Sequence, residues 1–196
     1  MNPIRLDLPG ACVDLYHDVF DNTACDRYFK LLLALPDWRA REIVVHGRPC
    51  KQNRLTCFYA ADPSLNYRYS GINNGNAPVF PSFLQEIREV AEGICGCSFN
   101  YCLLNWYPNG KSTIGWHADD ERDLAPGSKI ASFSFGAERY FDFRRKDNHK
   151  EKTRVTLTNG CLLIMGEGTQ THYHHQVPQQ ARVLQPRINL TFRSVK

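Results

Sequence analysis

The chain has 196 residues, of which 42% are hydrophobic and 22% charged, and its formal net charge is +4. This length suits one domain with a substantial core, and the composition excludes a disordered chain. The longest apolar run, residues 31–35, is far too short to cross a bilayer, so we expect no membrane association. The mildly basic balance is compatible with a polyanionic partner but does not require one.

The cysteines and the N-terminus indicate an intracellular protein. The first residues contain no apolar segment followed by a small-residue cleavage site, so secretion is not expected. The eight cysteines are scattered, and Cys95-Gly96-Cys97 is CxC rather than CxxC. We therefore expect reduced cysteines that pack as small hydrophobic residues.

The first half of the chain mixes helices and strands. Asn22 and Thr23 suit the start of a helix over residues 25–33, which Pro36 ends. A β-rich stretch follows from about residue 43 to 69, with a hairpin whose turn contains Gly47. A second helix is predicted from Pro81 to about residue 94, because its apolar residues form one stripe.

The second half reads as short strands. They are predicted at residues 99–107, 130–135, 139–144, 154–158, 161–165, 171–177 and 187–193. Asn159-Gly160 is a strong signal for a two-residue hairpin. At least seven short strands favour an all-β sandwich or jelly roll. We expect a single domain, mainly β, in which residues 1–98 form an N-terminal α+β lid on a catalytic core of residues 99–196.

His117-Ala118-Asp119 is a candidate metal site. Residues i and i+2 on a strand project to the same face, so the imidazole and the carboxylate could share one ion. A later histidine would complete a 2-His-1-carboxylate set, which leaves positions open on iron(II) for co-substrate and oxygen. The alternative is a histidine hydrogen-bonded to a nearby carboxylate without any metal.

The third ligand would come from a histidine cluster late in the chain. Its members are His172, His174 and His175. On a strand, His172 and His174 share one face, while His175 points to the other. Strand parity therefore leaves the choice open.

The segment from Arg187 to Arg193 alternates polar and apolar residues. Its polar positions are Arg187, Asn189, Thr191 and Arg193. Two guanidinium groups on one face suit a dicarboxylate, because each pairs with a carboxylate in a bidentate fork. Asn105 and Tyr107, again at i and i+2, could add donors from a neighbouring strand. The alternative is an ordinary half-buried surface strand.

Four motifs occur in a specific order. They are NxYxxG at 105–110, HxDDE at 117–121, SFG at 134–136 and RxNxTFR at 187–193. The set resembles the AlkB family of iron(II)- and 2-oxoglutarate-dependent dioxygenases, and most of all the animal DNA-repair homologues (the second and third human members). The resemblance covers roughly residues 40–195 and implies a double-stranded β-helix, or jelly roll, as the core.

The resemblance implies roles for the site residues. The family's metal-binding histidine precedes a proline by three positions, as His175 precedes Pro178, so the implied iron ligands are His117, Asp119 and His175, with His174 as rival. Arg187 would bind the distal carboxylate of 2-oxoglutarate with Asn105 and Tyr107. Arg193, with Asn189 and Thr191 nearby, would hold the end closer to the iron.

The resemblance also implies a reaction and a substrate. It is the oxidative demethylation of 1-methyladenine and 3-methylcytosine in DNA with O2, which releases formaldehyde, succinate and carbon dioxide. The target base must be flipped out of the duplex. Tyr67 and Tyr69 match the family's aromatic lid, in which Tyr69 would stack on one face of the flipped base and His117 would pack on the other face. Asp120 and Glu121 would contact the base edge, where acids attract a cationic methylated base.

At two positions the sequence departs from the family pattern, and both bear on whether the nucleic-acid substrate is single-stranded or double-stranded. Val45-His46-Gly47 corresponds to an apolar finger, but its tip here is His46. Cys50 stands where the family tends to carry an arginine. Both leave single-stranded DNA or RNA open as substrates. Lys51, Arg54 and residues 144–146 are either phosphate contacts or solvated surface.

The sequence thus predicts a monomeric enzyme that acts on nucleic acid, with DNA favoured over RNA. The expected location is the nucleus in a eukaryote and the cytoplasm otherwise. The alternatives are an RNA demethylase, a protein hydroxylase on the same scaffold, and a nucleic-acid-binding module without catalysis.

Overall fold

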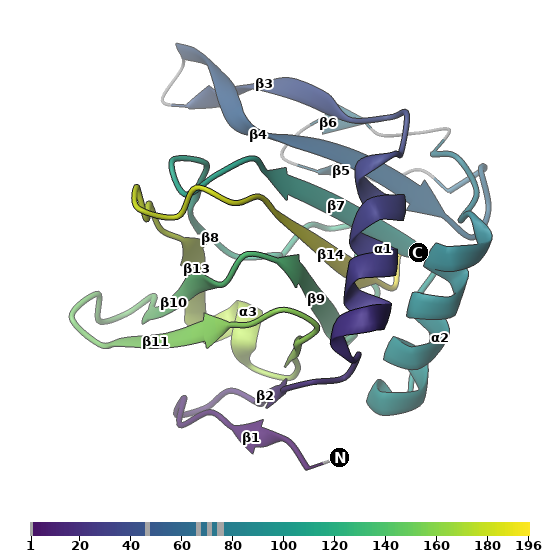
Figure 1. The fold of residues 1–196 in the computed structure, drawn as a ribbon. Coiled ribbons are helices and arrows are strands. Elements are labelled where there is room, and N and C mark those ends of the chain that lie inside the picture. Colours follow the sequence, from purple (N-terminus) through teal and green to yellow (C-terminus); the bar gives the residue numbers. More distant parts are fainter. Residues whose placement is uncertain (1, 46–47, 66–67, 70–71, 74–76) are drawn as a thin grey trace.

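The protein folds into two stacked β-sheets with two helices against the larger one (Figure 1). The computed structural model describes residues 2–45, 48–65, 68–69, 72–73 and 77–196, and it describes side chains outside residues 43–51 and 66–76. The helices are α1 (Asn22–Leu33), α2 (Ser82–Cys95) and α3 (Thr169–His172). The strands are β1 (Ile4–Arg5), β2 (Val13–Tyr16), β3 (Arg39–Val45), β4 (Arg48–Ala60), β5 (Arg68–Tyr69), β6 (Ile72–Asn73), β7 (Tyr101–Tyr107), β8 (Ile114–His117), β9 (Ile130–Gly136), β10 (Arg139–Arg145), β11 (Lys152–Leu157), β12 (Leu162–Met165), β13 (Tyr173–Val177) and β14 (Arg187–Arg193).

The sheets pair strands that lie far apart in the sequence. The larger sheet has the order β1-β2-β12-β9-β14-β7-β4-β3, and the smaller sheet has the order β11-β10-β13-β8. β5 and β6 form a separate two-stranded ribbon. The strand pairs in all three sheets are antiparallel. These packed antiparallel sheets confirm the predicted jelly-roll architecture.

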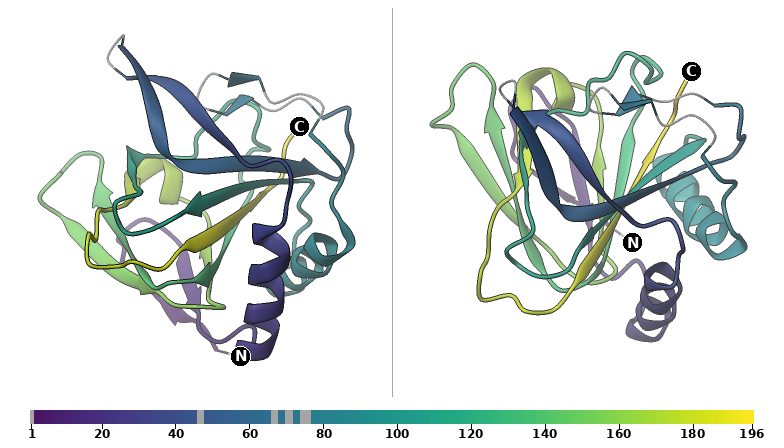
Figure 2. Two further views of the ribbon diagram at one scale, coloured as in Figure 1. Left: turned by 45° about the horizontal axis from the view of Figure 1, so that its top comes forward. Right: turned by 90° about the horizontal axis from the view of Figure 1, so that it is seen from above.

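Hydrophobic side chains fill the space on both sides of the larger sheet. On one side, Leu32 of α1 and Ile87 of α2 pack against Phe133 and Leu190 of the sheet. On the other side, Phe143 of the smaller sheet packs in a second cluster with residues of the larger sheet. β14 is buried along its whole length between these layers (Figure 2). It is therefore a central strand and not the half-buried surface strand that the sequence also allowed.

Both long helices form where the sequence predicted them, α1 from its start signal and Pro36 and α2 from its apolar stripe. The side chain of Asp21 caps α1 by accepting a hydrogen bond from the backbone N–H of Ala24, so the cap precedes the predicted Asn22-Thr23. Pro81 stands at the N-cap of α2, and Gly96 ends that helix with a φ of 66°. A left-handed residue at this position costs glycine little, because it has no Cβ.

The predicted Asn159-Gly160 hairpin is wrong. β11, before the turn, pairs with β10 in the smaller sheet, whereas β12, after it, pairs with β2 and β9 in the larger one. The Gly160 N–H donates to the Ser134 carbonyl and the Asn159 side chain accepts from the Gly136 N–H. The turn therefore carries the chain between sheets. The strand predicted over 171–177 is also shorter, because residues 171–172 belong to α3.

The first half of the chain supplies strands as well as helices. β2 joins the larger sheet beside β12, and β4 joins it beside β7. The boundary at residue 98 between lid and core remains a prediction. Among the described residues, no helix has the length and apolar character needed to cross a membrane. The seven cysteines whose side chains are described are free thiols, as expected for reduced cysteines.

Arg139 holds together the loop that follows β7 and the loop that follows β13. Its guanidinium is 1% exposed and donates to the carbonyl oxygens of residues 109, 110, 112 and 178 and to the side chain of Gln180. Gly110 of the NxYxxG motif lies in the first loop, where a Cβ would overlap the Gln180 carbonyl oxygen. The motif glycine therefore serves the close packing of these loops.

Replacing Arg139 by methionine should lower the free energy of unfolding by about 3 kcal/mol, because several buried carbonyl groups lose their donor. Urea denaturation measures this loss. Arg27→Met is the matched control, since that arginine pairs with Glu86 and both side chains are about half exposed (54% and 49%), and it should cost about 1 kcal/mol or less. Equal losses in the two variants would contradict the role given to Arg139.

Candidate active site

A small cavity, partly open to solvent, lies between the two sheets. Polar side chains line it from both sides: Asn105, Tyr107, His117, Asp119, Ser132, His175, Asn189, Thr191 and Arg193. The apolar wall consists of Leu103, Ile114, Phe141, Met165 and Val177. A concave site with a few convergent polar groups among apolar ones is typical of ligand binding.

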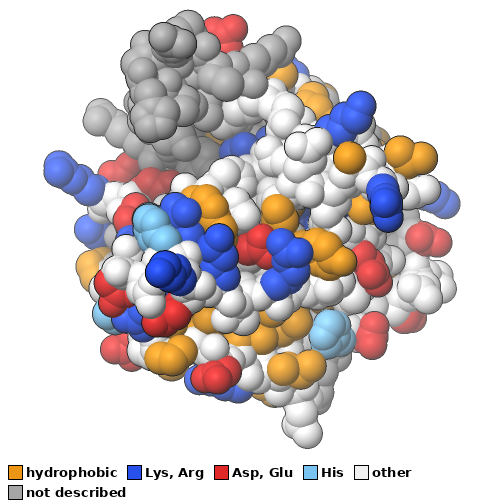
Figure 3. All heavy atoms as spheres, turned by 90° about the vertical axis from the view of Figure 1, so that its left-hand side faces the viewer, with side chains coloured by type: hydrophobic (Ala, Val, Ile, Leu, Met, Phe, Trp, Pro, Cys, Tyr) orange, Lys and Arg blue, Asp and Glu red, His pale blue; other side chains and the backbone are white. Residues whose placement is uncertain are grey.

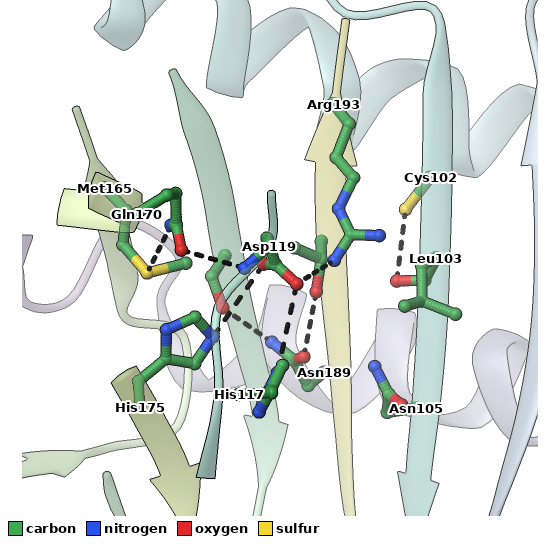
Figure 4. A network of polar contacts seen from close by, with 12 residues as sticks. Cys102, Leu103, Asn105, His117, Asp119, Met165, Gln170, His175, Asn189 and Arg193 are labelled. Atoms are coloured by element: carbon green, nitrogen blue, oxygen red, sulfur yellow. Dashed lines mark hydrogen bonds and ion pairs between the residues drawn. The ribbon is translucent and has the colours of Figure 1, made fainter. Parts of the chain in front are cut away.

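Three possible metal ligands converge at this cavity (Figure 4). His117 ends β8, Asp119 follows two residues later, and His175 lies directly across from His117 on β13. Nε2 of His117 is 3.9 Å from one carboxylate oxygen of Asp119, and Nε2 of His175 is 3.8 Å from the other. These distances are too long for hydrogen bonds and leave room for a shared ion.

The protonation states of the three groups suit a metal. Burial lowers the pKa of His175 to about 3, and desolvation also lowers the pKa of His117. Burial alone would raise the pKa of Asp119, but the neighbouring cationic groups, with Arg193 first among them, lower that pKa. At neutral pH the site therefore presents two neutral imidazoles and a carboxylate, which is the form that binds a cation.

Neighbouring groups orient these ligands. Nδ1 of His117 lies 2.8 Å from the Gly115 carbonyl oxygen, which can only accept, so Nδ1 carries the proton and Nε2 has a free lone pair. The Asp119 backbone N–H donates to the Gln170 side chain, and Arg193 donates to the Asp119 carboxylate at 2.8 Å. His174 lies on the same strand as His175 but alternates with it and is half-buried. The structure thus brings His175, and not His174, next to Asp119.

Two neutral nitrogens and one carboxylate oxygen form the donor set of mononuclear iron(II) sites. An ion at a 100-fold excess over its Kd stabilises a protein by about 2.7 kcal/mol, which here corresponds to a rise in Tm of roughly 5–10 °C. Anaerobic thermal melts with iron(II) or manganese(II) should show this rise, and a chelator should reverse it. His175→Ala should lose the rise while His174→Ala keeps it. The opposite pattern would transfer the ligand role to His174.

Asn189, Thr191 and Arg193 of the arginine strand line the cavity from the larger sheet, whereas Arg187 is not among the residues that line it. In the register of β14 and β7, Arg187 lies opposite Tyr107 and Asn189 lies opposite Asn105. Arg187 is 1% exposed, and its Nη2 donates to the Ser134 hydroxyl at 2.9 Å. Its Nε and Nη1 have no hydrogen-bond partner among the residues that the structure describes. A buried guanidinium with two unused donors is a fitting partner for a carboxylate.

The other predicted co-substrate residues differ in which of their hydrogen-bond donors remain unused. Asn189 uses its amide N–H groups on the Ser132 hydroxyl and the Phe133 carbonyl, and its oxygen accepts from the Thr191 hydroxyl. The side-chain oxygen of Asn105 accepts a hydrogen bond from Arg54. Asn189 and Thr191 therefore shape the wall of the cavity, and Asn105 keeps its amide nitrogen for a ligand.

The predicted substrate contacts fall partly within the described residues. Asp120 is exposed, and with Glu121 it borders a second, more open hollow that also reaches Asp119. The remaining predicted contacts lie outside the residues whose side chains the structure describes: Val45, His46, Gly47, Tyr67 and Tyr69. Their roles remain predictions, as does any role of Lys51.

The structure corrects one of the predicted phosphate contacts. Arg54 is 5% exposed and hydrogen-bonds inside the protein, so it is neither a phosphate contact nor solvated surface. Arg144 lies 4.4 Å over the ring of Trp116, on the outer face of the smaller sheet. Lys146 donates to the Gln170 carbonyl and lies 3.4 Å from Asp120. Figure 3 shows that cationic side chains gather on this face, with acidic ones among them.

The sequence does not indicate the roles of two further residues of the site. Ser134 is part of the SFG motif, but the motif does not predict its contact with Arg187. Gln170 carries no signal in the sequence, because glutamine is common on surfaces. Their positions depend on strand pairing and on the path of α3, so local patterns could not have found them.

Comparison with known proteins agrees with this site. The model of the 2OG-Fe(II) oxygenase superfamily matches residues 13–193. The chain is 45% identical over 157 residues to the human DNA oxidative demethylase ALKBH2, covering 76% of this chain and 58% of that protein. It is 35% identical over 191 residues to the human alpha-ketoglutarate-dependent dioxygenase alkB homolog 3, covering 93% of this chain and 66% of that protein. The chain therefore spans about three fifths of the length of these relatives.

A solved structure supports the fold. The structure of OsALKBH1 superposes with a TM-score of 0.71 over 98% of this chain and 100% of that one, at 17% identity. The jelly roll, the His-Asp-His cluster and the arginine strand define an oxygenase-type site. The chain belongs to the 2OG-Fe(II) oxygenase superfamily. Its similarity to the alkB homologues confirms the AlkB-type resemblance that the motifs predicted.

Proposed function

We propose that this chain is an iron(II)- and 2-oxoglutarate-dependent dioxygenase that removes N-alkyl groups from nucleobases in DNA. One observation carries the proposal. Three possible metal ligands with suitable protonation states line a cavity, and Asn189, Thr191 and Arg193 of the buried arginine strand line the same cavity. The names of the relatives, a DNA oxidative demethylase and an alpha-ketoglutarate-dependent dioxygenase, support the same reaction.

His117, Asp119 and His175 would hold iron(II), which when bound supplies the centre that oxidises 2-oxoglutarate and substrate with O2. Arg187 would bind the distal carboxylate of 2-oxoglutarate through the donors that it has unused. Tyr107, opposite Arg187, and Asn105 would assist it. Arg193 would face the end of the co-substrate near the metal while it holds Asp119 in place.

The protein's further task would be to present the alkylated base. A target methyl group would be hydroxylated and leave as formaldehyde, while 2-oxoglutarate leaves as succinate and carbon dioxide. Asp120 and Glu121 border the hollow next to Asp119, where they would attract the positive charge of 1-methyladenine or 3-methylcytosine. Tyr67 and Tyr69 would close over the base as an aromatic lid.

The nucleic acid would approach over the part of the surface near β13 and α3. Arg144 and Lys146 lie next to β13 and α3, beside the metal ligands, and would offset phosphate charge. The acidic side chains among them would keep non-specific binding weak. We propose that the chain acts as a monomer, and in the nucleus if its source is a eukaryote.

The test is anaerobic reconstitution with iron(II) and 2-oxoglutarate, followed by oxygen and four matched oligonucleotides. These are single- and double-stranded DNA and RNA with one 1-methyladenine or 3-methylcytosine, and mass spectrometry reads the loss of one methylene unit. Demethylation of DNA that needs both iron and 2-oxoglutarate is the expected result. Preference for RNA would favour the RNA demethylase. Succinate without any oligonucleotide change would overturn the nucleobase assignment and leave a protein hydroxylase as the leading function.

A further inference from the structure

Arg54 is a buried cation that the proposed reaction does not yet use. It belongs to β4, and its side chain points to the neighbouring strand β7. Its Nε donates to the side-chain oxygen of Asn105 at 2.8 Å, and its Nη1 donates to the Thr113 carbonyl at 3.4 Å. Arg54 itself does not line the cavity, whereas Asn105 does.

The hydrogen bond to Asn105 determines which end of that amide is available. The two ends of an asparagine side chain are nearly equal in size, but one accepts and the other donates. Arginine has donors only, so it holds the amide oxygen on its own side. The amide nitrogen of Asn105 is then the group left for the cavity (Figure 4). A flipped amide would turn an oxygen toward an anionic ligand and lose the bond to Arg54.

The residue before Arg54 makes a separate connection. The Asn53 side chain donates to the Lys111 carbonyl and accepts from the Thr113 N–H, both at 2.9 Å. These bonds hold the loop that leads into β8 and its metal ligand His117, but they do not involve Asn105. A substitution at Asn53 would therefore remove an anchor of this loop and leave the contact that orients the Asn105 amide in place.

We propose that Arg54 is a positioning residue for 2-oxoglutarate, which acts by fixing the Asn105 amide with its N–H groups toward the carboxylate of the co-substrate. The inference rests on the proposed function, because it assumes that a 2-oxoglutarate molecule occupies the cavity. A bond from a charged donor is the stronger kind of hydrogen bond, and burial of both partners strengthens it further. Hydrogen-bond partners of metal ligands change metal affinity or activity by about 10- to 100-fold, and we expect the lower end of this range for the partner of a residue that binds an organic anion.

The experiment is anaerobic calorimetry of the manganese(II)-loaded protein titrated with 2-oxoglutarate. Wild type, Arg54→Met, Asn105→Ala and the double variant form a cycle. We expect Arg54→Met to weaken binding by about 10-fold in the wild-type background. In the Asn105→Ala background it should have almost no effect, since the amide through which it acts is gone. Thermal melts of each variant report whether the fold is retained.

Two controls give the cycle its specificity. Asn53→Ala removes the loop anchor alone and should leave 2-oxoglutarate affinity unchanged, as should Arg88→Met, which removes a partly buried arginine on α2. An equal loss in Asn53→Ala would mean that loop anchoring explains the effect, and would overturn the inference. So would a full 10-fold loss on top of Asn105→Ala, because it would indicate a direct action of the Arg54 charge.

The result for wild type separates this inference from the proposed function. If wild type does not bind 2-oxoglutarate, both are overturned. If wild type binds and Arg54→Met binds equally well, only the inference is overturned, and the proposed oxygenase stands.

Discussion

Replacing Asp119 by alanine is expected to abolish metal binding and with it all 2-oxoglutarate turnover. Asp119 is 4% exposed, and it contributes the only carboxylate of the metal cluster found among the described residues. Partners one step behind a metal ligand already change affinity by 10- to 100-fold, so loss of the ligand itself should reduce turnover by more than about 100-fold. Succinate formation with iron(II) in excess measures the effect.

An isosteric variant tests whether the loss is chemical or structural. Asp119→Asn retains an oxygen that can accept the hydrogen bond from Arg193, but it lacks the negative charge. We expect it to keep the fold, since the buried guanidinium keeps an acceptor, and still to lose the metal-dependent rise in Tm. Turnover at the wild-type rate in either variant would refute the assignment of Asp119 as a metal ligand.

Replacing Arg187 by alanine is expected to weaken 2-oxoglutarate binding by about 100-fold. Loss of one partner in a buried, hydrogen-bonded charge pair costs about 2–5 kcal/mol, and every 1.4 kcal/mol corresponds to a factor of ten. The Ser134 hydroxyl would also lose the hydrogen bond that it accepts from Nη2 of Arg187. The KM for 2-oxoglutarate and calorimetry of the manganese(II)-loaded protein both measure this change.

The specificity of the loss identifies which end of the co-substrate Arg187 binds. A short 2-oxo acid without the second carboxylate, such as pyruvate, should bind weakly and equally to wild type and Arg187→Ala. Arg187→Lys should restore only part of the 2-oxoglutarate affinity, because a lysine gives a point charge in place of a bidentate fork. A variant that binds both acids as wild type does would contradict the assignment.

The site could be predicted largely because its parts are short and local. His117 and Asp119 are two residues apart, and the polar residues of β14 alternate along one strand. Such spacings fix the face of a side chain whatever the strand pairs with. Asn105 and Tyr107 were expected on a neighbouring strand, and the register of β7 against β14 confirms that they are neighbours.

Pairing between distant strands decided what local patterns could not. Strand parity does not decide which of His172, His174 and His175 is the third ligand. The register of β13 against β8 sets His175 across from His117. The Asn159-Gly160 signal predicted a hairpin because its residues suit a tight turn. The strands on either side joined different sheets instead, since β11 and β12 found their partners in β10, β2 and β9.

Burial of charged residues was the other feature that the sequence concealed. Arg54 and Arg139 look like surface residues in the sequence, because arginine is usually exposed. Each is buried because carbonyl or amide oxygens from distant segments surround its guanidinium. Those oxygens come from residues far along the chain, so no window around either arginine contains them.

The sequence by itself therefore determined the chemistry of the donors, the alternation of the strands and the family. Residue types and their i, i+2 spacings are local properties, and they persist in any fold that contains the strands. Only the tertiary structure decided which histidine joins Asp119, which arginines are buried and how Asn105 is oriented. These depend on contacts between segments far apart in the sequence, such as Arg193 and Asp119, which are 74 residues apart, and such contacts form only when the whole sandwich assembles.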